Sequence, residues 1–270
     1  WDCSNRNVMF SSYRNHQAPL RRYPTYGFRC VLVASAVATS APVRMPATRP
    51  INSPATPAPK DGYTNTLGMK FVPVPGTKVL FCIHETRYQD YAAYAAESPD
   101  VDKTWQDQNH DGFVITERAP EHPVTKVDWE DSSKFCLWLS KKEGRTYRLP
   151  TDREWSCAAG LGDYEKWGYE TTPATVNKHR SDFPWGGAWP PPPSVGNYSD
   201  QSRRDKTPVA NAEYMEGFND GFPTTAPVMS FPPNKLGLYD LGGNLWEWCG
   251  DWIDNTKKQR VGRGGSWASY

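Results

Sequence analysis

Three kinds of residue in this sequence have types and spacings suited to chemistry: oxygen-bearing side chains, cysteines and histidines. The stretch DQNHDGF (Asp107–Phe113) has the order of the first half of an EF-hand loop, in which alternate side chains supply oxygen ligands to calcium. The acidic residue needed at position 12 is absent, because Arg118 stands there and Glu117 lies one residue short. The sequence therefore favours a solvated turn over an ion site at this stretch.

Cysteine usage points to disulfides rather than to a metal site. No two cysteines form a CxxC motif, so a zinc site is not indicated. An even number in a chain rich in Pro and Gly favours disulfides and an oxidising compartment, with buried free thiols as the alternative. The six are Cys3, Cys30, Cys82, Cys136, Cys157 and Cys249.

Charge and composition exclude some function classes. The 270 residues carry 31 Lys and Arg against 30 Asp and Glu, and no basic run interleaves with aromatics, so nucleic acid is not an expected partner. No apolar run approaches the ~20 residues of a membrane span. Hydrophobic content is only 37%, yet there are 12 Trp and 14 Tyr, which is typical of a loop-rich fold held by aromatic side chains.

A small number of regular elements must position these residues. The stretch MKFVPVPGTKVLFC predicts two short strands joined by a Pro-Gly turn, followed by a helix near Tyr88–Ala95. A second helix is predicted to begin after the N-cap Asp128 and to end at Gly144. Thr151 precedes Glu154 by three residues, which predicts a capping box and a third, shorter helix.

Two long stretches lack such periodicity. Residues 34–63 are dominated by Ala, Pro, Thr and Ser and cannot bury enough apolar surface to order themselves, so they are expected to form a linker. Asp163–Pro233 is rich in Pro and Gly, and loops of that length in a compact domain are usually functional or braced by ions.

Several ordered blocks carry a resemblance to a known family. They are HPVTKVDWEDSSKFCLWLS, YRLPTDREWSCAAGL, FPWG, NDGFPTTAPVMSFPPNKLGLYDLGGNLWEWCGDW, RVGRGGSW and YGFRC. In this order they resemble blocks of the formylglycine-generating (sulfatase-modifying factor) family. The resemblance implies an α+β fold of the C-type-lectin-like kind, loop-rich, with few helices and short antiparallel strands.

The order of the blocks raises a question about domain organisation. In that family RGGSW is followed by a loop, an Arg-rich strand and the closing strand GFRC, whereas here the closing material is Trp1–Val33. We therefore expect residues 1–33 to close a lectin-like module of the same or a neighbouring copy, and residues 64–270 to form the main body. A tandem array is favoured over a circular permutation, and a renumbered one-domain chain is the third alternative.

The resemblance also bears on catalysis. Oxidases of the family bind copper through a pair of cysteines, and those positions are occupied here by Ser269 and Ser4, next to Cys3. A hydroxyl cannot replace a thiolate as a ligand of the soft copper(I) ion. Neither copper nor the oxidase reaction is therefore expected. The family's iron-dependent sulfoxide synthases need a His-bearing helical domain, and this chain has five His and no HxxxH pattern.

Calcium is the cofactor that the resemblance implies, at two sites built from side-chain and main-chain oxygens. The implied residues of the first site are Asn197, Tyr198 (carbonyl), Asp220 and Phe222 (carbonyl). Those of the second site are Gly242 and Leu245 (carbonyls), Asn244 and Glu247. The alternative is that Asn197 and Asn244 are turn residues and that Glu247 is a salt-bridge partner.

The family pairs a cysteine of the FCLWLS helix with that of GFRC, which implies a disulfide between Cys136 and Cys30. Of the 15 connectivities that six cysteines allow, Cys82–Cys249 and Cys3–Cys157 would complete the set.

The junction of the two chain ends occupies the position of the family's substrate groove. Its residues could hold a peptide, a glycan or a neighbouring module, and the alternative is that Trp1 and Tyr13 fill a groove that has lost its chemistry. The expected ligand or partner face comprises Trp1, Asn5, Arg6, Asn7, Tyr13, Arg14 and Tyr270.

Together these features predict a non-catalytic, calcium-stabilised lectin-like module of an exported repeat protein. It would act in assembly, adhesion or ligand display, in a filament or a multivalent surface protein, with neighbouring copies as partners. The expected location is extracellular, at the cell surface or periplasmic. Two alternatives are a copper-dependent oxidase that converts a protein cysteine to formylglycine, and the sensory ectodomain of a signalling protein.

Overall fold

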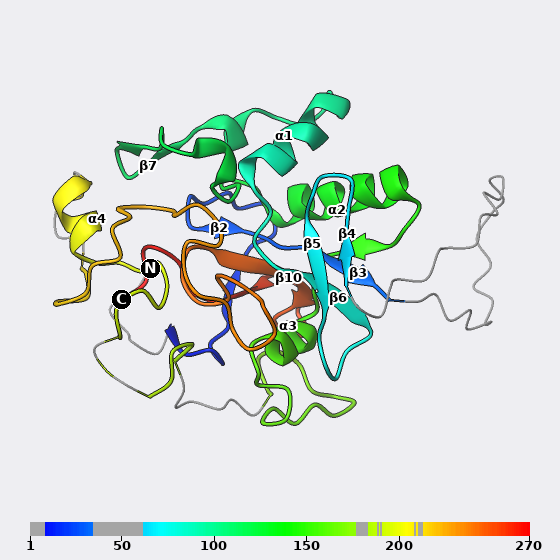
Figure 1. The fold of residues 1–270 in the computed structure, drawn as a ribbon. Helices are drawn as coiled ribbons and strands as arrows, with labels where there is room; N and C mark the ends of the chain where they lie inside the picture. Colours follow the sequence, from blue (N-terminus) through cyan, green and yellow to red (C-terminus); the bar gives the residue numbers. More distant parts are fainter. Residues whose placement is uncertain are drawn as a thin grey trace, which may run out of the picture.

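A computed structural model describes residues 9–34, 62–176, 183–187, 189, 191–207, 209 and 213–270 of the chain. Within these residues helices and short strands are mixed, and long irregular segments join them (Figure 1). The helices are α1 (Tyr88–Glu97), α2 (Trp129–Glu143), α3 (Asp152–Ala158) and α4 (Gln201–Lys206), with 3₁₀ turns η2 (Thr104–Gln106) and η3 (Ala119–Glu121).

The strands form three sheets, in which β2 and β10 pair in parallel and every other pair is antiparallel. The four-stranded sheet has the order β1 (Asn15–Gln17), β11 (Arg260–Arg263), β10 (Trp246–Trp252), β2 (Tyr26–Gly27). The five-stranded sheet has the order β4 (Tyr63–Thr64), β5 (Lys70–Pro73), β6 (Val79–Cys82), β3 (Val31–Val33), β9 (Tyr147–Arg148). The third is the hairpin of β7 (Asn109–His110) and β8 (Phe113–Val114).

The predicted helices form for the local reasons that the sequence contains. The carboxylate of Asp128 accepts the N–H of Asp131 at 2.9 Å and thereby caps α2, and Gly144 ends that helix at a φ of 63°. Thr151 and Glu154 form the predicted capping box of α3. The two strands around the Pro-Gly turn are β5 and β6. The one helix that periodicity missed is α4, a single short element inside the Pro- and Gly-rich stretch.

Aromatic side chains fill the core, as the composition indicates. Trp155, Trp248 and Trp267 are among the largest fully buried side chains. The rings of Tyr91 and Phe135 stack at a centroid distance of 5.9 Å and join α1 to α2. Helix α2 in turn contacts β9 of the five-stranded sheet, whereas α3 contacts β10 and β11 of the four-stranded sheet (Figure 1).

Residues 9–34 are integral to both large sheets. They supply β1 and β2 to the four-stranded sheet and β3 to the interior of the five-stranded one. Gly27 permits a close approach in β2, because a Cβ there would lie 2.6 Å from a Leu245 side-chain carbon and 2.7 Å from the Val124 carbonyl.

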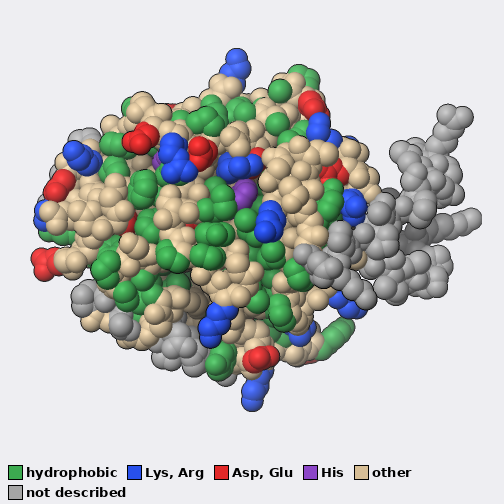
Figure 2. All heavy atoms as spheres, in the orientation of Figure 1, with side chains coloured by type: hydrophobic (Ala, Val, Ile, Leu, Met, Phe, Trp, Pro, Cys, Tyr) green, Lys and Arg blue, Asp and Glu red, His purple; other side chains and the backbone are tan. Residues whose placement is uncertain are grey.

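On the surface, basic and acidic side chains are interspersed over the face drawn in Figure 2, with hydrophobic side chains between them. No helix in the described part of the chain has the length and apolarity required to cross a bilayer.

Candidate functional site

The turn that ends the chain holds Ser269 at the position where the resemblance places the first copper-binding cysteine. Its hydroxyl oxygen accepts the N–H of Ser266 at 3.1 Å, and the side chain is buried. Its carbonyl accepts the N–H of Ser199 at 2.8 Å. A hydroxyl engaged in a tight turn therefore stands at this position. Ser4 and Cys3 lie outside the described residues.

Beside this turn, Trp267 lies between two side chains from distant segments. The guanidinium of Arg203 is 5.1 Å from the centre of the indole, and the ring of His110 stacks on it at 6.1 Å. His110 contacts the Thr125 hydroxyl at 2.9 Å through Nε2, and burial lowers the pKa of His110 to about 3. The imidazole is therefore neutral at physiological pH and serves as a packing element here.

The EF-hand-like stretch forms the β7–β8 hairpin, and its acidic side chains are paired with bases. Asp107 forms an ion pair with Lys126, and Asp111 forms one with Arg203 at 3.0 Å. The Asn109 side-chain oxygen accepts a backbone N–H of the turn at 3.0 Å. This arrangement agrees with the solvated-turn interpretation.

The residues of the first implied calcium site are brought together. The amide nitrogen of Asn197 donates to the Thr224 carbonyl at 2.7 Å, whereas its buried Oδ1 atom has no hydrogen-bond partner among the described residues. The carboxylate of Asp220 accepts the N–H groups of Tyr198 at 2.9 Å and Phe222 at 2.8 Å. The unpartnered buried oxygen of Asn197 and the half-buried carboxylate of Asp220 suit a hard cation.

A second carboxylate lies against this set. The backbone N–H of Asp220 donates to the side chain of Asp200, and burial, together with the nearby Asp200 carboxylate, raises the pKa of Asp220. A bound cation would relieve that penalty, so the residues present fit calcium.

The second implied site differs, because Glu247 is already neutralised. Its carboxylate accepts the Nε–H of Arg29 at 2.8 Å and the indole N–H of Trp155 at 3.0 Å, and a further Arg29 N–H group completes the ion pair. The Glu247 and Arg29 side chains are both fully buried. The salt-bridge alternative for Glu247 is thus the arrangement found.

The other residues of this set serve the loop between Asp240 and Leu245. The Asn244 side-chain oxygen accepts from the Asn197 amide at 3.0 Å and from the N–H of Ala226 at 2.9 Å. Gly243 has a φ of 82°, and a Cβ there would lie 2.3 Å from the Asn197 carbonyl.

Gly242 makes a second close approach in the same loop, since a Cβ at Gly242 would lie 2.4 Å from a Pro184 side-chain carbon and 2.7 Å from the Tyr198 hydroxyl. Both glycines let the loop carrying the second set pack directly on the first.

Two carboxyl groups that sequence reasoning missed join Glu247. Glu85 accepts the Asn244 amide at 2.6 Å and the N–H of Leu245 at 3.1 Å, and Asp240 accepts the N–H of Met229 at 2.9 Å. Burial and the neighbouring carboxylates raise the pKa of Glu85 well above its usual range, and burial raises that of Asp240 to about 6. A sequence signal existed: each acidic residue stands among apolar neighbours, in FCIHE and GLYDLGG.

We call Arg29, Glu85, Asp240 and Glu247 the three-carboxylate cluster. With one guanidinium against three carboxyl groups, it carries two negative charges in excess when ionised, and a divalent cation would offset them. Glu247 fits the role of a calcium ligand poorly, because Arg29 already neutralises it. Glu85 and Asp240 fit that role better. No three His, Cys, Asp or Glu side chains converge as metal ligands in the described ranges, so carbonyl and amide oxygens would have to complete any ligand set.

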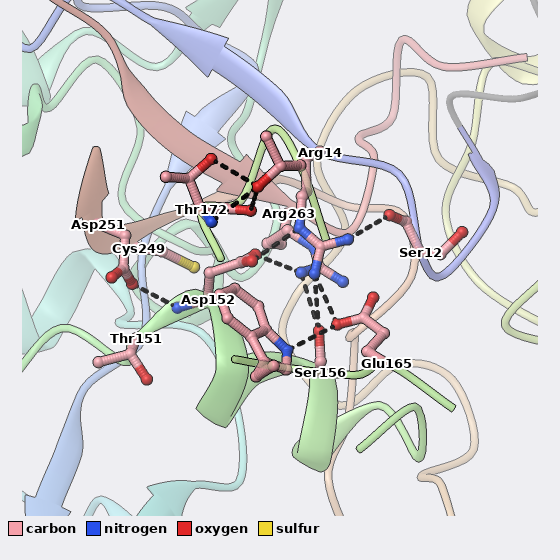
Figure 3. Close-up of polar contacts among 12 residues, drawn as sticks. Ser12, Arg14, Thr151, Asp152, Ser156, Glu165, Thr172, Cys249, Asp251 and Arg263 are labelled. Carbon is pink, nitrogen blue, oxygen red and sulfur yellow. Dashed lines mark hydrogen bonds and ion pairs between the residues drawn. The ribbon is translucent and has the colours of Figure 1, made fainter. Parts of the chain in front are cut away.

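A second buried charge cluster ties β1 and β11 to α3 (Figure 3). Arg14 pairs with Asp152 at 2.7 Å and with Glu165 at 2.6 Å, and Arg263 pairs with the other oxygen of Asp152. Both guanidinium groups also contact the Ser156 hydroxyl, at 3.3 and 3.0 Å. We call these five residues the balanced network, because two cations meet two anions.

The balanced network corrects one expectation. Arg14 was expected on an exposed ligand face, but its side chain is fully buried because two carboxylates compensate its charge inside the protein. Tyr13 and Tyr270 are half-buried, and the ring of Tyr13 lies 5.9 Å from that of Trp246. The other expected face residues, Trp1, Asn5, Arg6 and Asn7, lie outside the described part of the chain.

The cysteines implied to pair are brought into contact. The sulfurs of Cys30 and Cys136 lie 3.2 Å apart in the core, where burial raises the pKa of Cys30 well above its usual range. All five described cysteines are free thiols, so Cys30 and Cys136 are in contact without a bond, and Cys82 is not paired with Cys249. Cys3 lies outside the described residues.

Comparisons with known proteins place these features in context. A family model described as "Sulfatase-modifying factor enzyme 1-like domain" matches residues 57–270. The chain is 36% identical to the formylglycine-generating enzyme of Thermomonospora curvata over 151 residues, which covers 55% of this chain and 39% of that protein. It is 34% identical to the Bos taurus "Inactive C-alpha-formylglycine-generating enzyme 2" over 168 residues, covering 60% of this chain and 44% of the relative.

The chain thus spans less than half the length of these curated relatives. Among solved structures, PvdO from Pseudomonas aeruginosa superimposes with a TM-score of 0.51 at 18% identity, covering 80% of this chain and 89% of that one. That likeness concerns the fold, which is the α+β, C-type-lectin-like fold expected from the sequence.

Proposed function

This chain belongs to the sulfatase-modifying factor enzyme 1-like family. We propose that it is a non-catalytic, calcium-stabilised module of an exported protein. It displays a ligand face and assembles with copies of itself. The observation that carries the proposal is the buried hydroxyl of Ser269, hydrogen-bonded to Ser266, at the position of a copper-binding cysteine. A family whose named members include an inactive enzyme accommodates such a loss.

The chemistry of this position argues against oxidation. Copper(I) prefers thiolate ligands, and the Ser269 hydroxyl is neither soft nor free, because it closes the terminal turn. Four described cysteines do not substitute for it, because Cys30 and Cys136 contact each other in the core and Cys82 and Cys249 are buried.

Calcium would act as a structural ion. Asn197, Asp220 and the main chain of the loop between them would hold one ion, and Asp240 and Glu85 with neighbouring carbonyls would hold another. The support is the unpartnered Asn197 oxygen and the excess charge of the three-carboxylate cluster. When bound, calcium supplies positive charge that lets these buried carboxylates ionise without a stability penalty.

Export would allow the Cys30 and Cys136 thiols, which lie 3.2 Å apart, to form a disulfide, because an oxidising compartment favours that bond. The expected location is accordingly extracellular, at the cell surface or periplasmic.

The test compares the unmodified chain with its Ser4→Cys/Ser269→Cys variant. Both are loaded with copper(I) against a chromophoric chelator and incubated with a cysteine peptide and oxygen, and the peptide is examined by mass spectrometry. We expect no turnover by the unmodified chain and at least a tenfold gain in copper(I) affinity (about 1.4 kcal/mol) in the variant. Conversion of the peptide cysteine to formylglycine by the unmodified chain would overturn the proposal.

A further inference from the structure

Residues 9–34 contribute strands to both large sheets, between or beside strands from the rest of the chain. Strand β3 is interior, with Val31 paired to Phe81 of β6 on one side and to Arg148 of β9 on the other. The same segment adds β1 to the edge of β11 and β2 to β10. Without it, β6, β9, β10 and β11 would each expose an unpaired edge.

Three buried contacts hold this segment to the rest of the chain. Arg14 pairs with Asp152 and Glu165 in the balanced network, Arg29 pairs with Glu247, and Cys30 touches Cys136. Each contact joins a residue of the segment to one more than 100 positions away. Removing the segment would leave Glu165 and Glu247 without the cations that pair with them, so the body of the chain, residues 62–270, requires this partner sequence in particular.

The covalent connection between segment and body is much longer than the fold requires. Val33 lies opposite Val79, and Tyr63 lies opposite Phe71, so the two ends are separated by β6 and β5. Three strand spacings and a three-residue offset amount to roughly 20 Å, which about six extended residues would bridge. The intervening residues 35–61 lie outside the described part of the chain, and their number alone allows a reach of up to ~90 Å.

We propose that residues 9–34 form an exchangeable closing segment, which inserts into the body of a second copy of this chain as it does into its own. The contacts are identical in the two cases, so effective concentration decides between them. For a connection of this many residues the expected effective concentration is of the order of 1 mM, and exchange prevails where copies are more concentrated or tethered together. This inference rests on the assembly role within the proposed function and names its mechanism.

The two contacting cysteines allow a selective test with the full chain. One variant carries Cys30→Ser and the other Cys136→Ser, both in a Cys3→Ser/Cys157→Ser background. Neither alone can form the bond between positions 30 and 136. The two are mixed, unfolded, and refolded under oxidising conditions at about 5 µM and at about 1 mM.

Exchange produces a disulfide-linked heterodimer of doubled mass, joined between Cys136 of one copy and Cys30 of the other. We expect its fraction to rise at least tenfold between the two concentrations. Only monomers at both concentrations, while the unmodified chain forms the bond internally, would overturn the inference. So would a heterodimer whose peptide map shows a different pair of cysteines.

A second measurement covers the case in which a serine variant does not refold. The unmodified chain is refolded at about 1 mM and diluted, and its mass is followed by light scattering. Dimers or larger species that persist after dilution support exchange, and monomers alone refute it. These readouts are independent of copper and calcium: a chain that exchanges but oxidises the peptide keeps this inference and loses the non-catalytic function.

Discussion

The balanced network and the three-carboxylate cluster are both buried and both join distant parts of the chain. They differ in net charge, because only the balanced network has as many cations as anions. Arg14 and Arg263 meet Asp152 and Glu165, so the balanced network is neutral by itself. In the three-carboxylate cluster, one guanidinium faces three carboxyl groups, two of which have raised pKa values.

The difference separates buried charge that the chain itself neutralises from buried charge that it does not. Buried ions are tolerated when partners and hydrogen bonds compensate them, and the balanced network meets that condition within the chain. The three-carboxylate cluster does not meet it unless its carboxyl groups take up protons or bind a cation. The proposed cation site therefore rests on an excess of buried charge and not on the types of residue alone.

The largest expected effect comes from unbalancing the network that is now neutral. Arg263→Met removes one of the two cations beside Asp152 and should lower the free energy of unfolding by about 3–5 kcal/mol. Asp240→Asn removes surplus negative charge and keeps the oxygen that accepts the Met229 N–H, so in the presence of a chelator it should change stability by less than about 1 kcal/mol. Urea unfolding with EDTA measures both.

Arg263→Lys is the control for the first variant, because it keeps the charge but not the forked contacts to Asp152 and Ser156. Its loss should be smaller than that of Arg263→Met. Equal losses in Arg263→Met and Asp240→Asn would contradict the distinction between the two clusters.

The next largest effect is the change in stability on adding calcium, which should depend on the three-carboxylate cluster and not on the balanced network. Calcium at 100 times its dissociation constant should stabilise the unmodified chain by about 2.7 kcal/mol per site. Asp240→Asn should lower the calcium affinity of the three-carboxylate cluster at least tenfold, which removes about 1.4 kcal/mol of that gain at fixed calcium. Thermal unfolding with calcium and with EDTA gives the difference.

Asp205→Asn is the matched control, since Asp205 lies on α4 and pairs with Arg204 at the surface. It should respond to calcium as the unmodified chain does. An unchanged response in Asp240→Asn would place any calcium away from the three-carboxylate cluster.

Local sequence predicted the parts of the fold that local interactions determine. Asp128 and Gly144 bound α2 because capping depends on near neighbours, and Thr151 starts α3 for the same reason. The resemblance placed Cys30 beside Cys136, which composition alone could not do.

The charge clusters were beyond such reasoning. Arg29 and Glu247 are 218 positions apart, and Arg14 and Glu165 are 151 apart, so no spacing in the sequence reports that they meet. An Arg in a segment next to aromatic residues looks the same whether it faces solvent or a buried carboxylate. Arg14 was misplaced for that reason, and Asp240 was overlooked because its partners are other acids and backbone groups.

The smallest expected effect is the loss of unfolding free energy at low pH that buried histidines cause. It limits the pH range over which the two clusters can be compared. Burial lowers the pKa of His110 to about 3 and that of His122 to about 4, so both are neutral in the folded protein. As pH falls below ~6.5, the unfolded chain takes up these protons first. Each histidine therefore lowers the free energy of unfolding by up to ~1.4 kcal/mol per pH unit, until its own folded-state pKa is reached.

His110→Gln removes one of these contributions and retains a polar group near the Thr125 hydroxyl. Its urea midpoints between pH 7 and pH 5 should fall less steeply than those of the unmodified chain, and His16→Gln, at an exposed position, controls for the substitution itself. Identical slopes in His110→Gln and the unmodified chain would mean that His110 is protonated while folded. Acid loss of stability would then fall to the other buried histidines, His84 and His122, because the raised pKa values of Glu85 and Asp240 stabilise the folded protein as pH falls.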